Sequence, residues 1–244
     1  MTIANADVPT RTRGHGLFLT MGVVSIVIVV AAFVPSIVQP RGRLGPLTPL
    51  LVAHGLAFFA WLLLFVVQAT LVATGRTGLH RRLGLAAAAL ALPLLPLGYA
   101  TAIAMGRRGF DLSGDLHIQS DPLLQLVFPL GDLVTFAVCI AAGYWFRRRS
   151  DYHKRFMLLG TIGAMLPAPV AHLLGHNLPT RGGLIVPMLA ALFAAPALYD
   201  RVALGRFHRV SLIGGVTLIL WGNVRATVIG PSAAWHEFAA ALVR

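Results

Sequence analysis

Seven long apolar runs, joined by short polar connections, account for most of this sequence. Each run is close to the roughly 20 residues that a helix needs to cross a hydrocarbon core about 30 Å thick. Such runs are helical, because a helix satisfies its own backbone hydrogen bonds where no water is present. The pattern therefore predicts an all-α polytopic membrane bundle of about seven transmembrane helices. The expected spans are residues 17–38, 48–74, 83–105, 121–146, 155–177, 182–199 and 210–230.

These spans form one expected transmembrane domain, residues 17–230. Residues 1–16 are expected to be a cytoplasmic tail, and residues 231–244 an interfacial tail on the outer side. In that tail Ser232 is expected to cap a short amphipathic helix anchored by Trp235. At the second span, Thr48 is the expected N-cap, with Pro49 in the first turn.

The composition excludes a soluble protein. Hydrophobic residues make up 57% of the chain and charged residues 11%, and the mean hydropathy is +0.78. Soluble globular domains usually carry about a quarter charged residues. The net charge of +12 does not indicate nucleic-acid binding, because the bases lie between apolar runs and not in an exposed basic segment. The expected partner is therefore the lipid bilayer.

Lysine and arginine in the connecting segments predict the orientation. Thirteen of these bases lie on the side of the N-terminus and six on the other side. Because cytoplasmic loops carry the excess of positive charge, the N-terminus is expected inside and the C-terminus outside. The expected location is the bacterial inner membrane, crossed several times.

A weak repeat divides the chain into one N-terminal helix and three helical hairpins. The inner elbow of each hairpin holds a histidine among arginines: His80 in GRTGLHRRLG, His153 in RRSDYHKRFM and His208 in GRFHRVSL. Such residues can simply fix topology at the lipid boundary. The alternative is an inner haem or anion site that uses His80 and His153.

Five ionisable residues are expected in the outer half of the bundle. They come from four spans: His54, Asp132, His172, His176 and Arg225. Ionisable groups inside a membrane are costly and often functional. His172 and His176 have the i, i+4 spacing that places two imidazoles on one helix face. The sequence thus predicts an outer site in which His54, His172 and His176 bind haem b or a transition metal, with Asp132 and Arg225 beside it.

Each of these residues also has a structural interpretation. His54 can hydrogen-bond a neighbouring helix, and His176 can be an interfacial residue. Asp132 and Arg225 can form an ion pair. No Walker A loop, dinucleotide fingerprint, HExxH motif or nucleophile elbow occurs in the chain.

Two segments carry a resemblance to known proteins. They are HGLAFFAWLLLFVVQATLVATGRTGLHRRLG and DYHKRFMLLGTIGAMLPAPVAHLLG. They resemble a group of uncharacterised bacterial inner-membrane proteins that share the HRRLG and HKRFM elbow motifs. More distantly, histidines near opposite ends of neighbouring helices are similar to those of membrane b-type cytochromes, including the transmembrane ferric reductases. That resemblance implies an outer haem on His54 with His172 or His176, and an inner haem on His80 with His153.

Three functions follow from these observations, and whether the protein is an enzyme stays open. The first is electron transfer or metal handling at a histidine-lined haem or metal site, with a respiratory or redox partner. The second is a zinc-dependent membrane hydrolase, similar in outline to seven-span ceramidase and adiponectin-receptor-like proteins. The third is a transporter or an assembly factor for a respiratory complex, without catalysis. The oligomeric state is left open.

Overall fold

The computed structural model describes residues 16–38, 48–109, 121–177 and 183–244, and in these residues the fold is all helical. The α-helices are α1 (Gly16–Val38), α2 (Pro49–Ala73), α3 (Thr77–Arg107), α4 (Pro122–Gln125), α5 (Val127–Trp145), α6 (Ser150–Met165), α7 (Pro167–Ala171), α8 (Ile185–Leu204), α9 (Arg209–Val224) and α10 (Ala233–Val243). Two π-helical segments are η1 (His172–Asn177) and η3 (Arg225–Ile229). The predicted all-α fold is confirmed.

The predicted polytopic bundle is confirmed as well. Among the described residues, six helical segments are long and apolar enough to cross a membrane, with α4 and α5 counted as one. A seventh span results when α6 and α7, which meet at an angle of 42°, are taken together. Apolar side chains cover the outside of the bundle, as is expected of helices that face lipid.

Capping residues define where the helices begin. The Thr48 hydroxyl accepts a hydrogen bond from the backbone N–H of Leu51 (3.3 Å), so the predicted N-cap of α2 is confirmed. The predicted cap of α10 is confirmed too, since Ser232 Oγ accepts from the N–H of Trp235 (3.2 Å).

The fifth predicted span is broken in its middle. Pro167 has no N–H to donate to the preceding turn, and α6 ends at Met165. Apolar residues four positions apart nevertheless run across the break and are fully buried at its centre: Leu158, Ile162, Leu166 and Val170. This stripe holds α6 and α7 in the middle of the largest core cluster.

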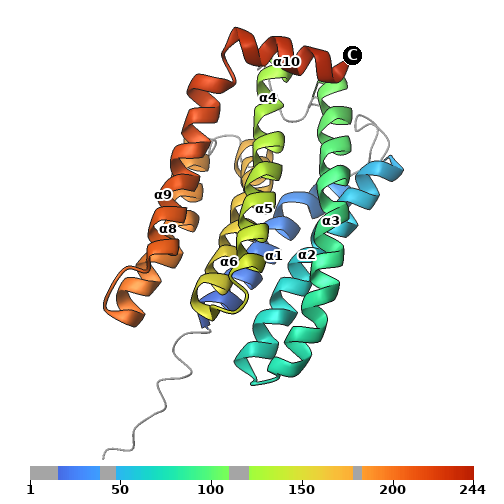
Figure 1. Ribbon diagram of the computed structural model, residues 1–244. Helices are drawn as coiled ribbons and strands as arrows, with labels where there is room; N and C mark the ends of the chain where they lie inside the picture. Colours follow the sequence, from blue (N-terminus) through green and yellow to red (C-terminus); the bar gives the residue numbers. More distant parts are fainter. Residues whose placement is uncertain (1–15, 39–47, 110–120, 178–182) are drawn as a thin grey trace, which may run out of the picture.

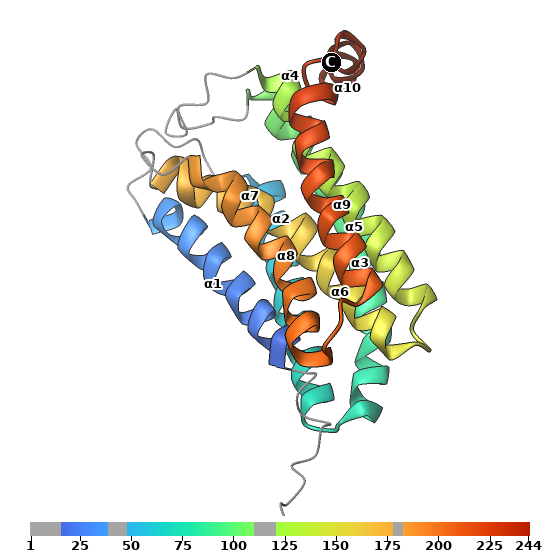
Figure 2. The same ribbon diagram turned by 90° about the vertical axis from the view of Figure 1, so that its left-hand side faces the viewer.

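The helices form three hairpins, α2–α3, α5–α6 and α8–α9, whose tight connections lie at one end of the bundle, here called the elbow end (Figures 1 and 2). Helix α1 begins near the elbow end and packs against α2 and the broken span. Helix α10 lies across the opposite end, over α4 and α3 (Figure 1).

The first two hairpins diverge toward the elbow end (Figure 1). Toward the other end α3 and α5 approach closely at Gly98, which has no Cβ atom. A Cβ atom added there would lie 2.6 Å from Leu133 Cδ2. Near the elbows a single side chain bridges the same two helices: the Tyr144 hydroxyl donates to the carbonyl oxygen of Gly84 (2.5 Å). The divergence opens a space between the α2–α3 and α5–α6 hairpins.

Candidate functional site

The space between the diverging hairpins is a cavity of about 810 Å³, here called the elbow-end pocket. Its apolar lining comes from α1, α2, α3 and α6 and includes two aromatic rings of α2, Trp61 and Phe65. Trp61 is held by a hydrogen bond from its indole N–H to the hydroxyl of Thr161 (3.1 Å). The inner part of the pocket is therefore apolar and partly aromatic, as is usual for sites that bind small organic molecules.

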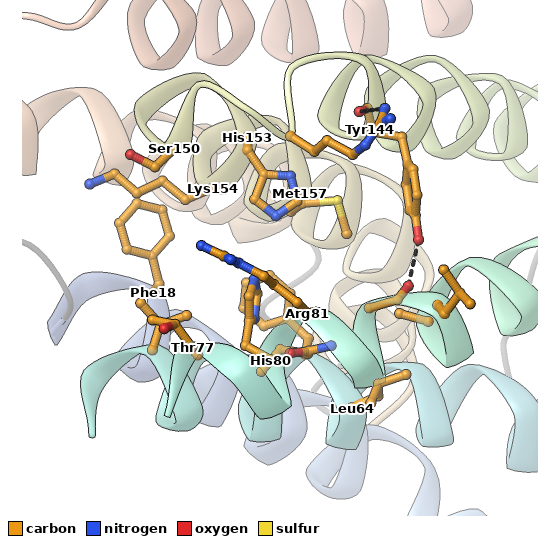
Figure 3. Close-up of a pocket in the computed structure, with 18 of the residues that line it drawn as sticks. Phe18, Leu64, Thr77, His80, Arg81, Tyr144, Ser150, His153, Lys154 and Met157 are labelled. Carbon is orange, nitrogen blue, oxygen red and sulfur yellow. Dashed lines mark hydrogen bonds between the residues drawn. The ribbon is translucent and has the colours of Figure 1, made fainter. Parts of the chain in front are cut away.

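Two histidines face each other across the elbow-end pocket. His80 lies in the first turn of α3 and His153 in the first turn of α6, and their ring centroids are 6.2 Å apart (Figure 3). The ring planes make an angle of 75°. Both residues were expected in the elbows themselves. They lie inside helices because α3 and α6 begin before them, at Thr77 and Ser150.

A backbone carbonyl orients His153. Its Nδ1 lies 2.8 Å from the carbonyl oxygen of Gly143 in α5. A carbonyl oxygen can only accept, so Nδ1 carries the proton, and in the neutral ring Nε2 keeps its lone pair. His153 therefore has the tautomer and orientation of a metal-ligating histidine.

A side-chain amide orients His80. Gln68 of α2 donates from its amide nitrogen to His80 Nδ1 (2.6 Å) and to the His80 carbonyl oxygen (3.2 Å). The amide oxygen of Gln68 accepts from the N–H of Gly84 (3.0 Å). A glutamine in an apolar span predicts a hydrogen bond between helices, and the structure confirms this for Gln68. The sequence does not indicate that its partner is His80.

The remaining polar residues of the pocket are mostly cations. Among the described residues that line it there is no carboxylate, and four of them are basic: Arg81, Arg147, Arg148 and Lys154. Of these, Lys154 also pairs with Asp151 (3.2 Å). An apolar cavity with basic residues suits a ligand that has an apolar body and anionic groups.

Asp132 and Arg225 of the predicted outer site form a buried ion pair. Arg225 Nη1 donates to Asp132 Oδ1 and to the Phe128 carbonyl oxygen, both at 2.7 Å. The guanidinium also lies over the rings of Phe128 and Trp221, 5.7 and 5.3 Å from their centroids. Only glycine fits at position 131, because a Cβ there would overlap the arginine side chain. This pair joins α5 to η3.

The histidines of the predicted outer site have other neighbours. His54 stacks on Phe58 within α2 (4.1 Å between centroids), and its buried Nδ1 has no hydrogen-bond partner among the described residues. The His172 ring lies 5.0 Å from the ring of Phe33 in α1. The side chain of His176 is outside the described part of the chain. Among described residues, no group of three or more His, Cys, Asp or Glu is placed to hold a metal ion.

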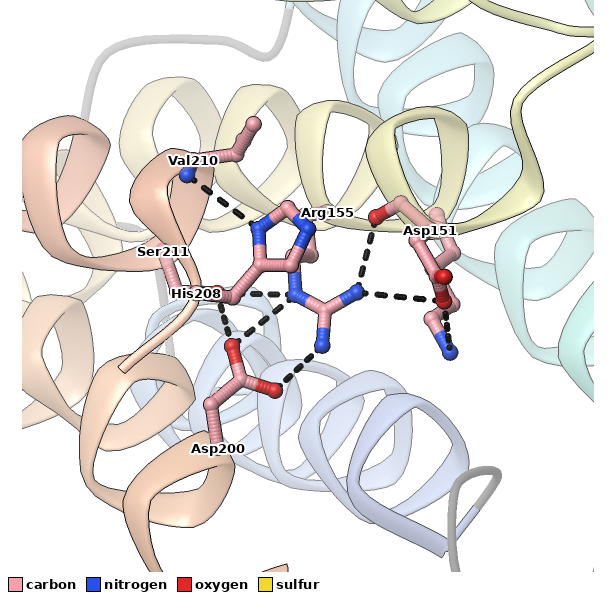
Figure 4. A network of polar contacts seen from close by, with 7 residues as sticks. Asp151, Arg155, Asp200, His208, Val210 and Ser211 are labelled. Carbon is pink, nitrogen blue, oxygen red and sulfur yellow. Dashed lines mark hydrogen bonds and ion pairs between the residues drawn. The ribbon is translucent and has the colours of Figure 1, made fainter. Parts of the chain in front are cut away.

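A second buried polar cluster joins the third hairpin to α6 (Figure 4). Arg155 forms a two-pronged ion pair with Asp200 of α8, and its Nε also donates to Ser211 Oγ of α9 (3.1 Å). Ser211 donates to Asp200 Oδ2 (2.5 Å). This network was missed, because Arg155 and the arginines around Asp200 resemble ordinary boundary charges.

His208, the third elbow histidine, is a helix cap. Its Nδ1 accepts from the N–H of Val210 (3.2 Å) at the start of α9. Partial burial, together with the nearby positive charge of Arg155, lowers the pKa of His208. A neutral imidazole is the form that can accept this hydrogen bond, so His208 has a structural role at its elbow.

Comparison of the chain with protein-family models, with curated proteins and with solved structures finds no match. The geometry of the elbow-end pocket is therefore the basis for a functional assignment.

Proposed function

We propose that this protein binds a b-type haem in the elbow-end pocket, between His80 and His153, and transfers electrons in the bacterial inner membrane. The observation that carries the proposal is the pair of imidazoles that face each other across the pocket, 6.2 Å apart between ring centroids. A bound haem supplies a one-electron couple whose potential depends on its axial ligands and surroundings.

The spacing of the two rings suits a single metal ion between them. A metal bonds an imidazole nitrogen at about 2 Å, so rings that ligate one ion from opposite sides have centroids about 6 Å apart. His153 presents Nε2 with a lone pair, and the Gly143 carbonyl provides the second hydrogen bond that metal-ligating histidines usually make. His80 faces it from the other hairpin.

The size of the ligand set favours haem over a bare metal ion. Structural and catalytic zinc sites take three or four protein ligands. The part of the chain that the structure describes contains no such group. A haem brings its own equatorial nitrogens and needs only axial ligands from the protein. For the same reason, we consider a zinc-dependent hydrolase less well supported than a haem protein.

The rest of the pocket suits both the apolar macrocycle of a haem and its anionic propionate groups. Trp61, Phe65 and Met157 would contact the apolar macrocycle. Arg81 and the basic residues of the α5–α6 elbow would bind the propionate carboxylates. Because the elbows carry the excess of arginine and lysine, we place this end of the bundle at the cytoplasmic surface.

The proposal is tested by the absorption spectrum of protein purified in detergent from haem-replete cells. Wild type should show a Soret band and a reduced α band. His80→Ala and His153→Ala should each lose most of the bound haem, whereas His54→Ala, a half-buried histidine outside the pocket, should retain it. Size-exclusion chromatography shows whether each variant is folded. A colourless wild type would contradict the proposal and favour a transporter or assembly factor.

A further inference from the structure

We propose that Gln68 is a positioning residue that selects the tautomer of His80, so that His80 can ligate a metal only after the Gln68 amide turns over. The tautomer of His80 concerns the protein without a cofactor and is independent of haem. The effect of the tautomer on metal ligation rests on the proposed function.

Three hydrogen bonds fix the orientation of the Gln68 amide. Its nitrogen lies 2.6 Å from His80 Nδ1 and 3.2 Å from the His80 carbonyl oxygen, and its oxygen lies 3.0 Å from the Gly84 nitrogen. The carbonyl can only accept and the backbone N–H can only donate, so the amide nitrogen must point toward His80. His80 Nδ1 is then an acceptor, and the proton of the neutral ring is on Nε2.

The two histidines are therefore in opposite tautomers. His153 donates from Nδ1 to the Gly143 carbonyl and keeps a lone pair on Nε2. In His80 the corresponding Nε2 carries a hydrogen. Towards the pocket, the pair offers one N–H donor and one acceptor. Only His153 is ready to bind a metal, since a ligating nitrogen must be free of its proton.

Turning the Gln68 amide would convert His80 to the ligating tautomer. The amide oxygen would then accept from a protonated Nδ1, the arrangement that orients most metal-ligating histidines. The turn gives up the bonds of Gln68 to the His80 carbonyl and the Gly84 N–H. These two groups are four residues apart in α3, where the helix already pairs them, so each keeps a partner. The turned amide oxygen would face the His80 carbonyl oxygen, so the Gln68 side chain must also move away from α3 when it turns.

The tautomer is measured by ¹⁵N NMR of haem-free protein labelled in histidine, with His80→Gln used to assign the signal. In wild type, Nε2 of His80 should be the protonated nitrogen. In Gln68→Glu the carboxylate can only accept, so the proton should move to Nδ1. Gln125→Glu, the same change on α4 at the opposite end of the bundle, should leave His80 as in wild type. A wild-type His80 protonated on Nδ1 would overturn the inference.

The coupling to ligation is measured by haem titration of the same proteins. Gln68→Glu should bind haem several-fold more tightly than wild type and have a lower midpoint potential, because a stronger acceptor on Nδ1 makes His80 a more basic ligand. Gln125→Glu should match wild type. Unchanged affinity and potential in Gln68→Glu would overturn this part. A wild type that binds no haem at all would instead refute the proposed function, while the NMR result still decides the tautomer.

Discussion

At the scale of single residues, the buried charges of this bundle are neutralised in pairs. In the described part of the chain, the charged side chains that are buried are Asp132 with Arg225 and Arg155 with Asp200. An unpaired charge in a low-dielectric interior is far more costly than a paired one. The pairs lie near opposite ends of α9 and fix its position relative to α5 and α6.

Removing one member of the Asp132–Arg225 pair should destabilise the protein strongly. In Asp132→Leu the Arg225 guanidinium loses its carboxylate and keeps the Phe128 carbonyl oxygen and two aromatic rings, none of which is charged. Breaking a buried ion pair in this way typically costs about 3–5 kcal/mol. We expect a clearly lower melting temperature in detergent. The double variant Asp132→Leu with Arg225→Met should recover most of the loss, and a double variant no more stable than the single one would contradict the pairing.

The elements of this fold are joined by polar contacts at their ends. The third hairpin, α8–α9, is attached to α6 through Arg155, Asp200 and Ser211 at the elbow end (Figure 4). The α10 helix is attached to α4 by a hydrogen bond from Trp235 Nε1 to the Leu123 carbonyl oxygen (2.8 Å). Between helices in lipid there is little hydrophobic driving force, so such contacts and close packing decide how helices associate.

Asp200→Ala should loosen the third hairpin at the elbow end. The variant leaves Arg155 buried without the Asp200 carboxylate, which accepts hydrogen bonds from its Nε and Nη2. We expect faster hydrogen–deuterium exchange in the elbow-end turns of α8 and α9, with little change in α2. Val202→Ala, at an exposed position two residues further along α8, is the matched control. Equal exchange in the two variants would show that the network does not hold the hairpin.

The attachment of α10 should depend on pH. His236 Nε2 lies 2.5 Å from Asp121 Oδ2 at the end of the bundle opposite the elbows. The Ser232 carbonyl and then the Asp121 carboxylate raise the pKa of His236 above 6.5. Desolvation acts to raise the pKa of Asp121, but the N–H of Leu123 and His236 hold it below 3.8. Because its pKa is raised, protonated His236 stabilises α10 at low pH. This effect is lost as the pH rises through the pKa of His236 in the folded protein. Because its pKa is lowered, ionised Asp121 stabilises α10 above the ordinary pKa of an aspartate. This effect is lost as the pH falls through the pKa of Asp121 in the folded protein.

The contact is therefore strongest between the ordinary pKa values of Asp and His, 3.8 and 6.5. Hydrogen–deuterium exchange of α10 should be slowest in this window and faster on either side. His236→Gln should remove the change on the alkaline side. Exchange of wild-type α10 that does not vary between pH 5 and pH 9, after correction for the intrinsic rate, would contradict this account.

For the whole molecule, the sequence predicts the bundle far better than its site. Apolar run length indicates the spans, and local signals such as Thr48 and Ser232 indicate helix starts. The outer site is predicted from depth in the membrane and from the i, i+4 spacing of His172 and His176, and neither says which neighbouring helix a side chain faces. His54 and His172 each turned out to lie against an aromatic ring.

The elbow-end pocket depends on how two hairpins diverge. That is a tertiary property, which follows from the close packing at Gly98 and from the position of α1. The sequence did offer the His80 and His153 pair as one alternative. It could not show that the two rings face each other, or that Gln68 and the Gly143 carbonyl orient them.

The most direct test of the central claim is the low-temperature electron paramagnetic resonance spectrum of the oxidised, haem-loaded protein. Two axial imidazoles on one iron produce a low-spin ferric signal. We predict that signal in wild type, and its replacement by a high-spin signal or by loss of haem in both His80→Gln and His153→Gln. A high-spin wild type, or a low-spin signal that survives in either variant, would contradict ligation by this pair.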